Sequence, residues 1–187
     1  MLSNTFHFLI NILFTLFGIA LILRAWTYAI RLHPFNPWSQ AVLRVTDWLV
    51  QPIRRIVSPG NRVDWPSLLA CWLTALAYLW LTWLLLTGGL PPIQSMAPSL
   101  VAALVTMLRW TFNVVLWVTL IQAILSWVNP MAPVMPVLTT LTAPLLDPIR
   151  RYMPHLGGLD LSPLVLLIIA QVAMVFLQQL AFSLFGV

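Results

Sequence analysis

Charged residues divide this chain into uncharged runs that are each long enough to cross a lipid bilayer. The runs cover residues 1–23, 65–108, 110–146 and 161–187, or 23, 44, 37 and 27 residues in turn. A membrane-spanning helix needs about 20 predominantly apolar residues. Only 7% of the chain is charged and 61% is hydrophobic, whereas a soluble domain carries about 25% charged residues. The sequence therefore predicts an integral membrane protein.

Four membrane-spanning helices are expected, and three of them have clear limits. The first is placed at residues 6–30 and the second at 67–87, where Gly88-Gly89 ends it. The fourth begins after Pro163 and reaches residue 185. The predicted fold class is thus an all-α membrane protein with about four spans.

The third helix allows two interpretations, which differ in the place of Arg109. A helix over residues 99–128 would be about 45 Å long, against a hydrocarbon core of about 30 Å. We therefore expect the span to begin near Arg109, which snorkels to the outer interface, with residues 96–108 as a hairpin arm or short helix there. The alternative is one long tilted helix with Arg109 buried, a position that is energetically costly and usually functional.

The arginines indicate the orientation of the chain. Seven of the nine Arg fall in or next to two connections, residues 31–66 and 129–162, which four spans place on the same face. Cytoplasmic loops carry an excess of Lys and Arg. Both connections are therefore predicted to be cytoplasmic, and both termini to lie on the opposite side.

One charged motif occurs twice. Pro52-Ile53-Arg54-Arg55 recurs 96 residues later as Pro148-Ile149-Arg150-Arg151, and Asp64 recurs as Asp160. Upstream of the motif, Arg24 aligns with Gln122 at a shift of 98. The pattern predicts two tandem repeats, residues 1–92 and 93–187. Each repeat is a helix, a Pro-rich connection and a helix, and because each holds an even number of spans the repeats are parallel.

We call residues 51–64 and 147–160 the first and second cassettes, and two hypotheses explain them. In one, the Arg residues bind anionic headgroups and fix the topology, and each Asp caps the following helix. In the other, an Arg–Asp pair, such as Arg151 with Asp160, pins the connection around a polar pocket on the pseudo-twofold axis. The candidate residues are Arg54, Arg55, Asp64, Asp147, Arg150, Arg151 and Asp160.

Each connection also contains a segment that is expected to be helical. Apolar residues recur at helical spacing over residues 38–49, with Gln40, Arg44 and Asp47 on the opposite face. This pattern predicts an amphipathic helix in the headgroup plane or packed under the spans. Its counterpart, residues 134–146, is apolar nearly all round, so we expect it to lie deeper or to be covered by another subunit.

The inventory of reactive side chains argues against several classes of function. The formal net charge of +5 comes from a few Arg that flank the predicted spans. Proteins that bind nucleic acid instead carry a broad basic face. Neither clustered metal ligands nor a pair of symmetry-related haem ligands occurs among the three His and the single Cys71. We expect no enzymatic activity, no cofactor, no metal and no nucleic-acid partner.

The second cassette, "D-P-I-R-R-Y-M-P" with a Gly pair and "D-L-S-P" before an apolar helix, resembles the YGGT family of bacterial inner-membrane proteins. The resemblance covers residues 20–85 and 118–182. The first cassette departs from the pattern, with Gln51 in place of the acidic residue and "D-W-P-S" in place of "D-L-S-P". Substitutions of Arg150 and Arg151 are therefore expected to be more harmful than those of Arg54 and Arg55.

The resemblance implies a role in osmotic-stress tolerance and ion homeostasis, or in the assembly of membrane complexes. Two functions remain open on these grounds: an accessory or scaffold protein, and a small transporter or channel subunit for an ion such as potassium. A transporter would need polar residues at mid-membrane, and the same residues also join helices. The expected partners are the bilayer with its anionic headgroups, and a second copy or another membrane protein.

Overall fold

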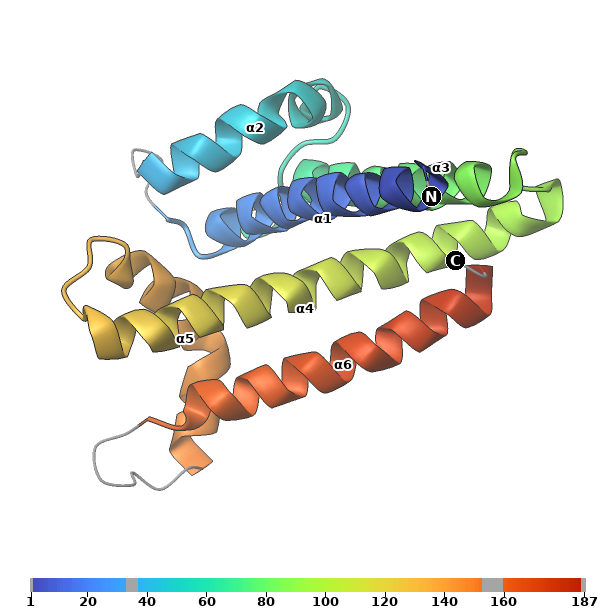
Figure 1. The fold of residues 1–187 in the computed structure, drawn as a ribbon. Coiled ribbons are helices and arrows are strands. Elements are labelled where there is room, and N and C mark those ends of the chain that lie inside the picture. Colours follow the sequence, from blue (N-terminus) through green and yellow to red (C-terminus); the bar gives the residue numbers. More distant parts are fainter. Residues whose placement is uncertain (1, 33–36, 153–159, 186–187) are drawn as a thin grey trace. The chain divides into compact units, whose positions relative to one another are not determined.

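A computed structural model describes residues 2–32, 37–152 and 160–185, and in these ranges the regular structure is helical (Figure 1). The elements are α1 (Leu2–Ala29), α2 (Pro37–Arg54), α3 (Trp65–Thr87), the short 3-10 helix η1 (Ile93–Ser95), α4 (Met96–Val128), α5 (Met135–Tyr152) and α6 (Ser162–Phe185).

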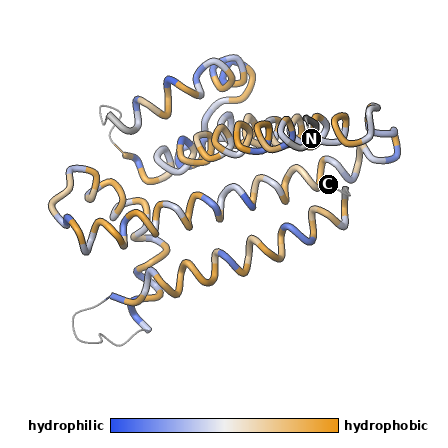
Figure 2. The backbone as a smooth tube through the Cα atoms, in the orientation of Figure 1, coloured by the Kyte–Doolittle hydropathy of each residue, from blue (hydrophilic) through white to orange (hydrophobic). Residues whose placement is uncertain are grey.

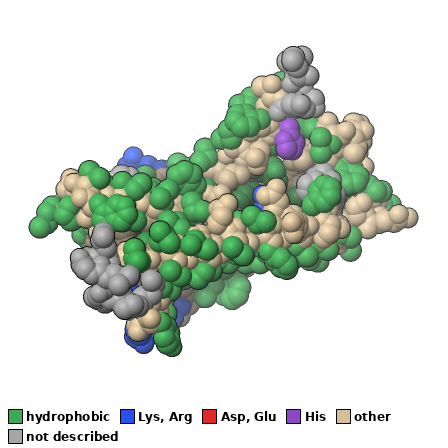
Figure 3. All heavy atoms as spheres, turned by 60° about the horizontal axis from the view of Figure 1, so that its bottom comes forward, with side chains coloured by type: hydrophobic (Ala, Val, Ile, Leu, Met, Phe, Trp, Pro, Cys, Tyr) green, Lys and Arg blue, Asp and Glu red, His purple; other side chains and the backbone are tan. Residues whose placement is uncertain are grey.

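Four of these helices are long and apolar enough to cross a membrane. They provide candidate spans at Thr5–Ala29, Trp65–Thr87, Ile93–Val128 and Ser162–Leu184. Figure 2 shows hydrophobic residues along the whole length of these helices, and hydrophobic side chains dominate the face seen in Figure 3. Such a surface suits contact with acyl chains, so the predicted fold class, an all-α membrane protein with four spans, is confirmed.

The chain forms two compact units, which are described separately. The first contains residues 1–111 and 176–187, and the second contains residues 112–175. In the first unit, α1 packs against α3, and α2 packs against both. The division between repeats at residues 92 and 93 stays a prediction, because these units follow packing rather than the sequence repeat.

Helix α3 ends where its sequence predicts. Gly88 has a φ of +72°, in the left-handed region that favours glycine, and its N–H donates to the carbonyl of Leu84. At the other end Asp64 precedes the helix and Pro66 lies in its first turn. Proline is tolerated there because backbone N–H groups of the first turn form no hydrogen bond within the helix.

The expected start of the third span near Arg109 is wrong. Helix α4 runs unbroken for 33 residues from Met96 to Val128, which is about 50 Å of helix. Pro98 falls in its first turn, where proline is tolerated, and no Gly or Pro follows before the helix ends. Arg109 is therefore a partly buried residue inside a long helix, as in the alternative interpretation.

Packing in the first unit fixes the level of this part of α4. Trp110 is buried, and an added Cβ at Gly18 of α1 would approach its ring to 2.2 Å. The Trp110 ring also lies 6.2 Å from the ring of Tyr78 on α3. Gly18 and Tyr78 are near the middles of their helices, so α4 at Trp110 passes the middle of both α1 and α3.

The two shorter helices, α2 and α5, are each buried along one face. In α2 the predicted apolar face is exposed at Val45 and Trp48, whereas Thr46 and Val50 are buried. In α5 the buried residues are Leu138, Leu141, Thr142 and Leu146. Thr139 and Thr140 are exposed on the other side of α5. The expectation that residues 134–146 lie deeper or are covered by another subunit stays a prediction.

Candidate functional site

The first cassette folds around a buried ion pair between Arg54, the last residue of α2, and Asp64, which precedes α3. The Arg54 Nη2 atom lies 3.0 Å from Asp64 Oδ2. Asp64 is only 1% exposed, so its charge requires partners. The pair joins the end of the amphipathic helix to the beginning of the next span, as the pinning hypothesis predicts.

Asp64 is the N-cap residue of α3 by position, but its carboxylate does not cap the helix in the expected way. It accepts no hydrogen bond from the backbone N–H groups of the first turn. It accepts one from the hydroxyl of Ser67 instead, at 2.6 Å. The Asp64 carboxylate therefore stabilises the ion pair with Arg54 and does not cap the backbone of α3.

Arg24 on α1 completes this cluster, and it was not among the residues that the sequence singled out. Its Nη1 atom donates to Thr46 Oγ1 and to Asp47 Oδ1, both at 2.8 Å. Its Nε atom lies 3.8 Å from Asp64 Oδ2, and the residue is 3% exposed. We call Arg24, Asp47, Arg54 and Asp64 the first clasp. Its two positive and two negative charges cancel, and it ties α1, α2 and the start of α3 together.

The second cassette contains the same pair at positions 96 residues later. Arg150 Nη2 and Nε each lie 2.8 Å from Asp160 Oδ2. Arg150 also reaches Asp147 at 3.4 Å, and the Ser162 N–H donates to Asp160 at 3.0 Å. Burial raises the pKa of Asp160, but the hydrogen bonds from Ser162 and Arg150 outweigh this effect and bring the pKa below its usual range. We call Asp147, Arg150 and Asp160 the second clasp.

The second Arg of each Arg–Arg pair is placed differently. Arg55 and Arg151 are exposed, and neither forms an ion pair within the described part of the chain. Arg150, and not Arg151, therefore holds Asp160, which corrects the pairing expected from the sequence. In the described part of the chain the first Arg of each pair therefore forms the ion pair with Asp, and headgroup binding by the second stays a prediction. Gly157-Gly158 of the second cassette lie outside the described residues.

The repeat extends to the helix before each cassette. Thr46 and Thr142 are 96 residues apart, and both are buried. Thr46 accepts a hydrogen bond from Arg24, and Thr142 donates one to Gln122. Arg24 and Gln122 are the pair that align at a shift of 98, so this alignment was the sequence signal for Arg24.

The two clasps differ in burial in a way that the sequence did not predict. Arg54 and Arg150 are similarly exposed, at 35% and 36%, but Asp64 is fully enclosed whereas Asp160 is 45% exposed. Among the described residues, the first clasp also leaves Arg24 Nε, Arg54 Nε and Asp64 Oδ1 buried without a hydrogen bond. Buried polar atoms of this kind usually bind an ordered water or another polar group. By geometry the first copy is thus the more enclosed site, although its sequence departs more from the family pattern.

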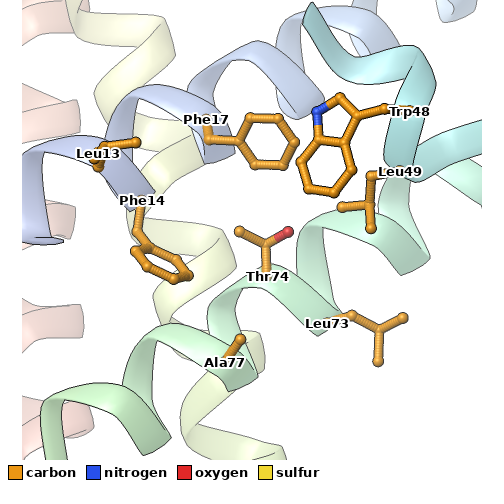
Figure 4. A pocket seen from close by; sticks show the side chains of 8 residues that line it. All are labelled: Leu13, Phe14, Phe17, Trp48, Leu49, Leu73, Thr74 and Ala77. Carbon is orange, nitrogen blue, oxygen red and sulfur yellow. The ribbon is translucent and has the colours of Figure 1, made fainter.

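The first unit also contains a pocket of about 380 Å³ between α1, α2 and α3 (Figure 4). Its lining residues are Leu13, Phe14, Phe17, Trp48, Leu49, Leu73, Thr74 and Ala77. The Thr74 hydroxyl donates to the carbonyl of Ala70 within its own helix, so hydrocarbon forms almost the whole lining. Within the described residues, His, Cys, Asp and Glu form no group of three that could hold a metal ion.

These features define a polytopic membrane protein built from a duplicated unit, in which a polar clasp joins a short amphipathic helix to its neighbours. The chain belongs to the CCB3/YggT family, whose model matches residues 3–86 and 101–181. The two matched segments agree with tandem repeats.

Similar proteins occur in several bacteria. The chain is 37% identical over 171 residues to "Uncharacterized protein in proC 3'region" of Vibrio alginolyticus, covering 91% of each chain. It is 34% identical over 170 residues to "Uncharacterized protein YggT" of Escherichia coli K12, covering 90% of this chain and 87% of the relative. A Haemophilus influenzae protein is 31% identical over 186 residues, covering 99% of this chain and 95% of the relative. No solved structure matches the chain.

Proposed function

We propose that the protein is a non-enzymatic accessory or scaffold protein of the bacterial inner membrane. It supports osmotic-stress tolerance or the assembly of membrane complexes. In this proposal both cassettes face the cytoplasm and both termini face the periplasm, because Arg-rich connections are retained on the cytoplasmic side.

The observation that carries the proposal is the use of polar side chains to join helices. Among the mid-membrane polar residues that a transporter could use, Asn11 accepts a hydrogen bond from Tyr78 of α3, and Gln122 bonds to Thr142 of α5. The pocket in the first unit is lined by hydrocarbon, which offers a hydrated ion no substitute for its water. These features suit a rigid structural element better than an ion pathway.

One observation favours the second candidate, an ion transporter or channel subunit. Arg24 Nε and Asp64 Oδ1 are buried and have no hydrogen-bond partner in the part of the chain that the structure describes. Polar groups in this state could contact a permeating ion or its water. The first clasp is neutral as a whole, however, so it provides no net charge that would attract a cation such as potassium.

Growth and flux measurements distinguish the two functions. We expect a deletion strain to grow poorly under hyperosmotic stress, and wild-type protein and Arg62→Ala to restore growth at equal membrane levels. Asp64→Asn should not restore it, because Arg24 and Arg54 lose their shared counter-ion. Arg62 is the matched control, since it is an exposed Arg of the same connection.

Purified protein in proteoliposomes should give no potassium flux above that of empty vesicles. A flux that Asp64→Asn abolishes would contradict the accessory role and establish transport. Normal growth of the deletion strain under hyperosmotic stress would remove the link to osmotic tolerance.

A further inference from the structure

Arg109 lies inside a candidate membrane span and has no counter-ion among the described residues. The Gly18–Trp110 contact places it level with a point about 16 Å from the end of α1 at Ala29, at 1.5 Å per residue. Tyr78 of α3, whose ring is near that of Trp110, is about 14 Å from the end of its helix at Thr87. Arg109 is thus close to mid-depth in a hydrocarbon core of about 30 Å.

The surroundings of Arg109 do not neutralise it. Within the described part of the chain its guanidinium forms no hydrogen bond or ion pair, and Tyr78 is the neighbour that acts on it electrostatically. A phenol has an ordinary pKa of about 10 and is uncharged at neutral pH. The Tyr78 hydroxyl is moreover already engaged, since it donates to Asn11 Oδ1 at 3.2 Å.

A second copy of the chain cannot supply the missing charge at this depth. The sequence contains four Asp and no Glu. Asp47, Asp64, Asp147 and Asp160 all lie in α2, in α5 or in the connections, outside the four candidate spans. An unpaired Arg at the centre of a membrane helix costs about 2.5–3.5 kcal/mol on insertion scales, and self-association would not remove this cost.

We propose that Arg109 is the recognition site for another membrane protein, which presents an Asp or Glu in the middle of one of its own spanning helices. A carboxylate accepts two parallel N–H bonds from the planar guanidinium. Arg109 itself is partly exposed, which leaves its side chain accessible to a partner helix. The inference rests on the scaffold role, for which it names the chemistry of the partner.

A synthetic helix provides the probe. A leucine-rich membrane-spanning peptide with one central Glu, and a matched peptide with Gln, would be labelled and mixed with the labelled protein in phosphatidylcholine vesicles. Energy transfer between the labels then measures association. We expect the wild-type protein to bind the Glu peptide roughly threefold to tenfold more tightly than the Gln peptide. The preference should vanish in Arg109→Leu and survive, at reduced size, in Arg109→Lys.

The stability of the isolated protein provides the second readout. Because the charge has no partner within the chain, Arg109→Leu should leave the melting temperature in detergent unchanged or raise it. Equal binding of the Glu and Gln peptides, a Glu preference that persists in Arg109→Leu, or a lower melting temperature of that variant would each overturn the proposal. A potassium flux that Asp64→Asn abolishes would instead contradict the scaffold role, and this outcome is measured separately.

Discussion

At the scale of single residues, Arg24 and Gln122 occupy equivalent places in the two repeats, but only Arg24 is charged. The acidic partner of Arg24 is also replaced in the second repeat. Asp47 balances Arg24 at 2.8 Å, and the residue 96 positions after Asp47 is Ala143. The positive and the negative charge are therefore absent together from the second repeat. Without Asp47, the buried Arg24 would keep only the more distant Asp64 as its counter-ion, and a buried charge with weakened pairing is destabilising.

The burial of the two Arg–Asp pairs leads to a prediction that reverses the one made from sequence. Arg54→Ala leaves Asp64 buried with only the more distant Arg24 as counter-ion, and we expect it to lower the free energy of unfolding by about 3 kcal/mol. Arg150→Ala breaks a half-exposed pair and should cost about 0.2–1 kcal/mol. Thermal or denaturant unfolding in detergent would measure both.

Arg55→Ala and Arg151→Ala are the matched controls, since each removes the neighbouring Arg, which is exposed and unpaired in the described structure. Both should change stability by less than their partners do. A loss from Arg150→Ala as large as that from Arg54→Ala would mean that burial does not govern the strength of the clasps.

At the scale of helices, the sequence predicted the positions of α1, α3 and α6 closely because apolar runs and Gly or Pro breakers mark their ends. The amphipathic pattern of α2 also predicted its helix. The pattern did not reveal which side is buried, because in a membrane protein the apolar side at Val45 and Trp48 can face lipid while Thr46 faces protein. Partners that are distant in sequence, such as Arg24 and Asp64, leave no local signal.

The length of α4 was misjudged because a charge was assumed to lie at the interface. The structure places Trp110 against Gly18, a contact that depends on the absence of a side chain on α1. Such packing cannot be recognised from hydropathy alone.

This contact provides a prediction at the same scale. Gly18→Ala should destabilise the protein by about 1–3 kcal/mol, because the added methyl group overlaps the Trp110 ring and the helices must separate. Gly89→Ala is the control, since a Cβ at Gly89 meets nothing within 4 Å. Melting temperature in detergent is the measurement, and Trp110→Leu should restore part of the loss. Equal effects at Gly18 and Gly89 would contradict the close approach of α1 and α4.

At the scale of the whole molecule, we interpret the chain as two copies of one clasped unit inserted in the same orientation. Equivalent residues of the two copies should then meet the same aqueous compartment. Ile56 and Tyr152 are such a pair, 96 residues apart and 87% and 90% exposed. Leu90, which is 80% exposed between α3 and α4, should meet the opposite compartment.

Thiol labelling of cells tests this claim most directly. Cys71 is the only cysteine in the sequence and is buried, so Cys71→Ala provides a background for Ile56→Cys, Tyr152→Cys and Leu90→Cys. In spheroplasts, a membrane-impermeant maleimide should label Leu90→Cys at once. It should label Ile56→Cys and Tyr152→Cys only after the membrane is permeabilised. Labelling of Ile56→Cys and Tyr152→Cys from opposite sides of the membrane would contradict a duplicated unit with parallel copies.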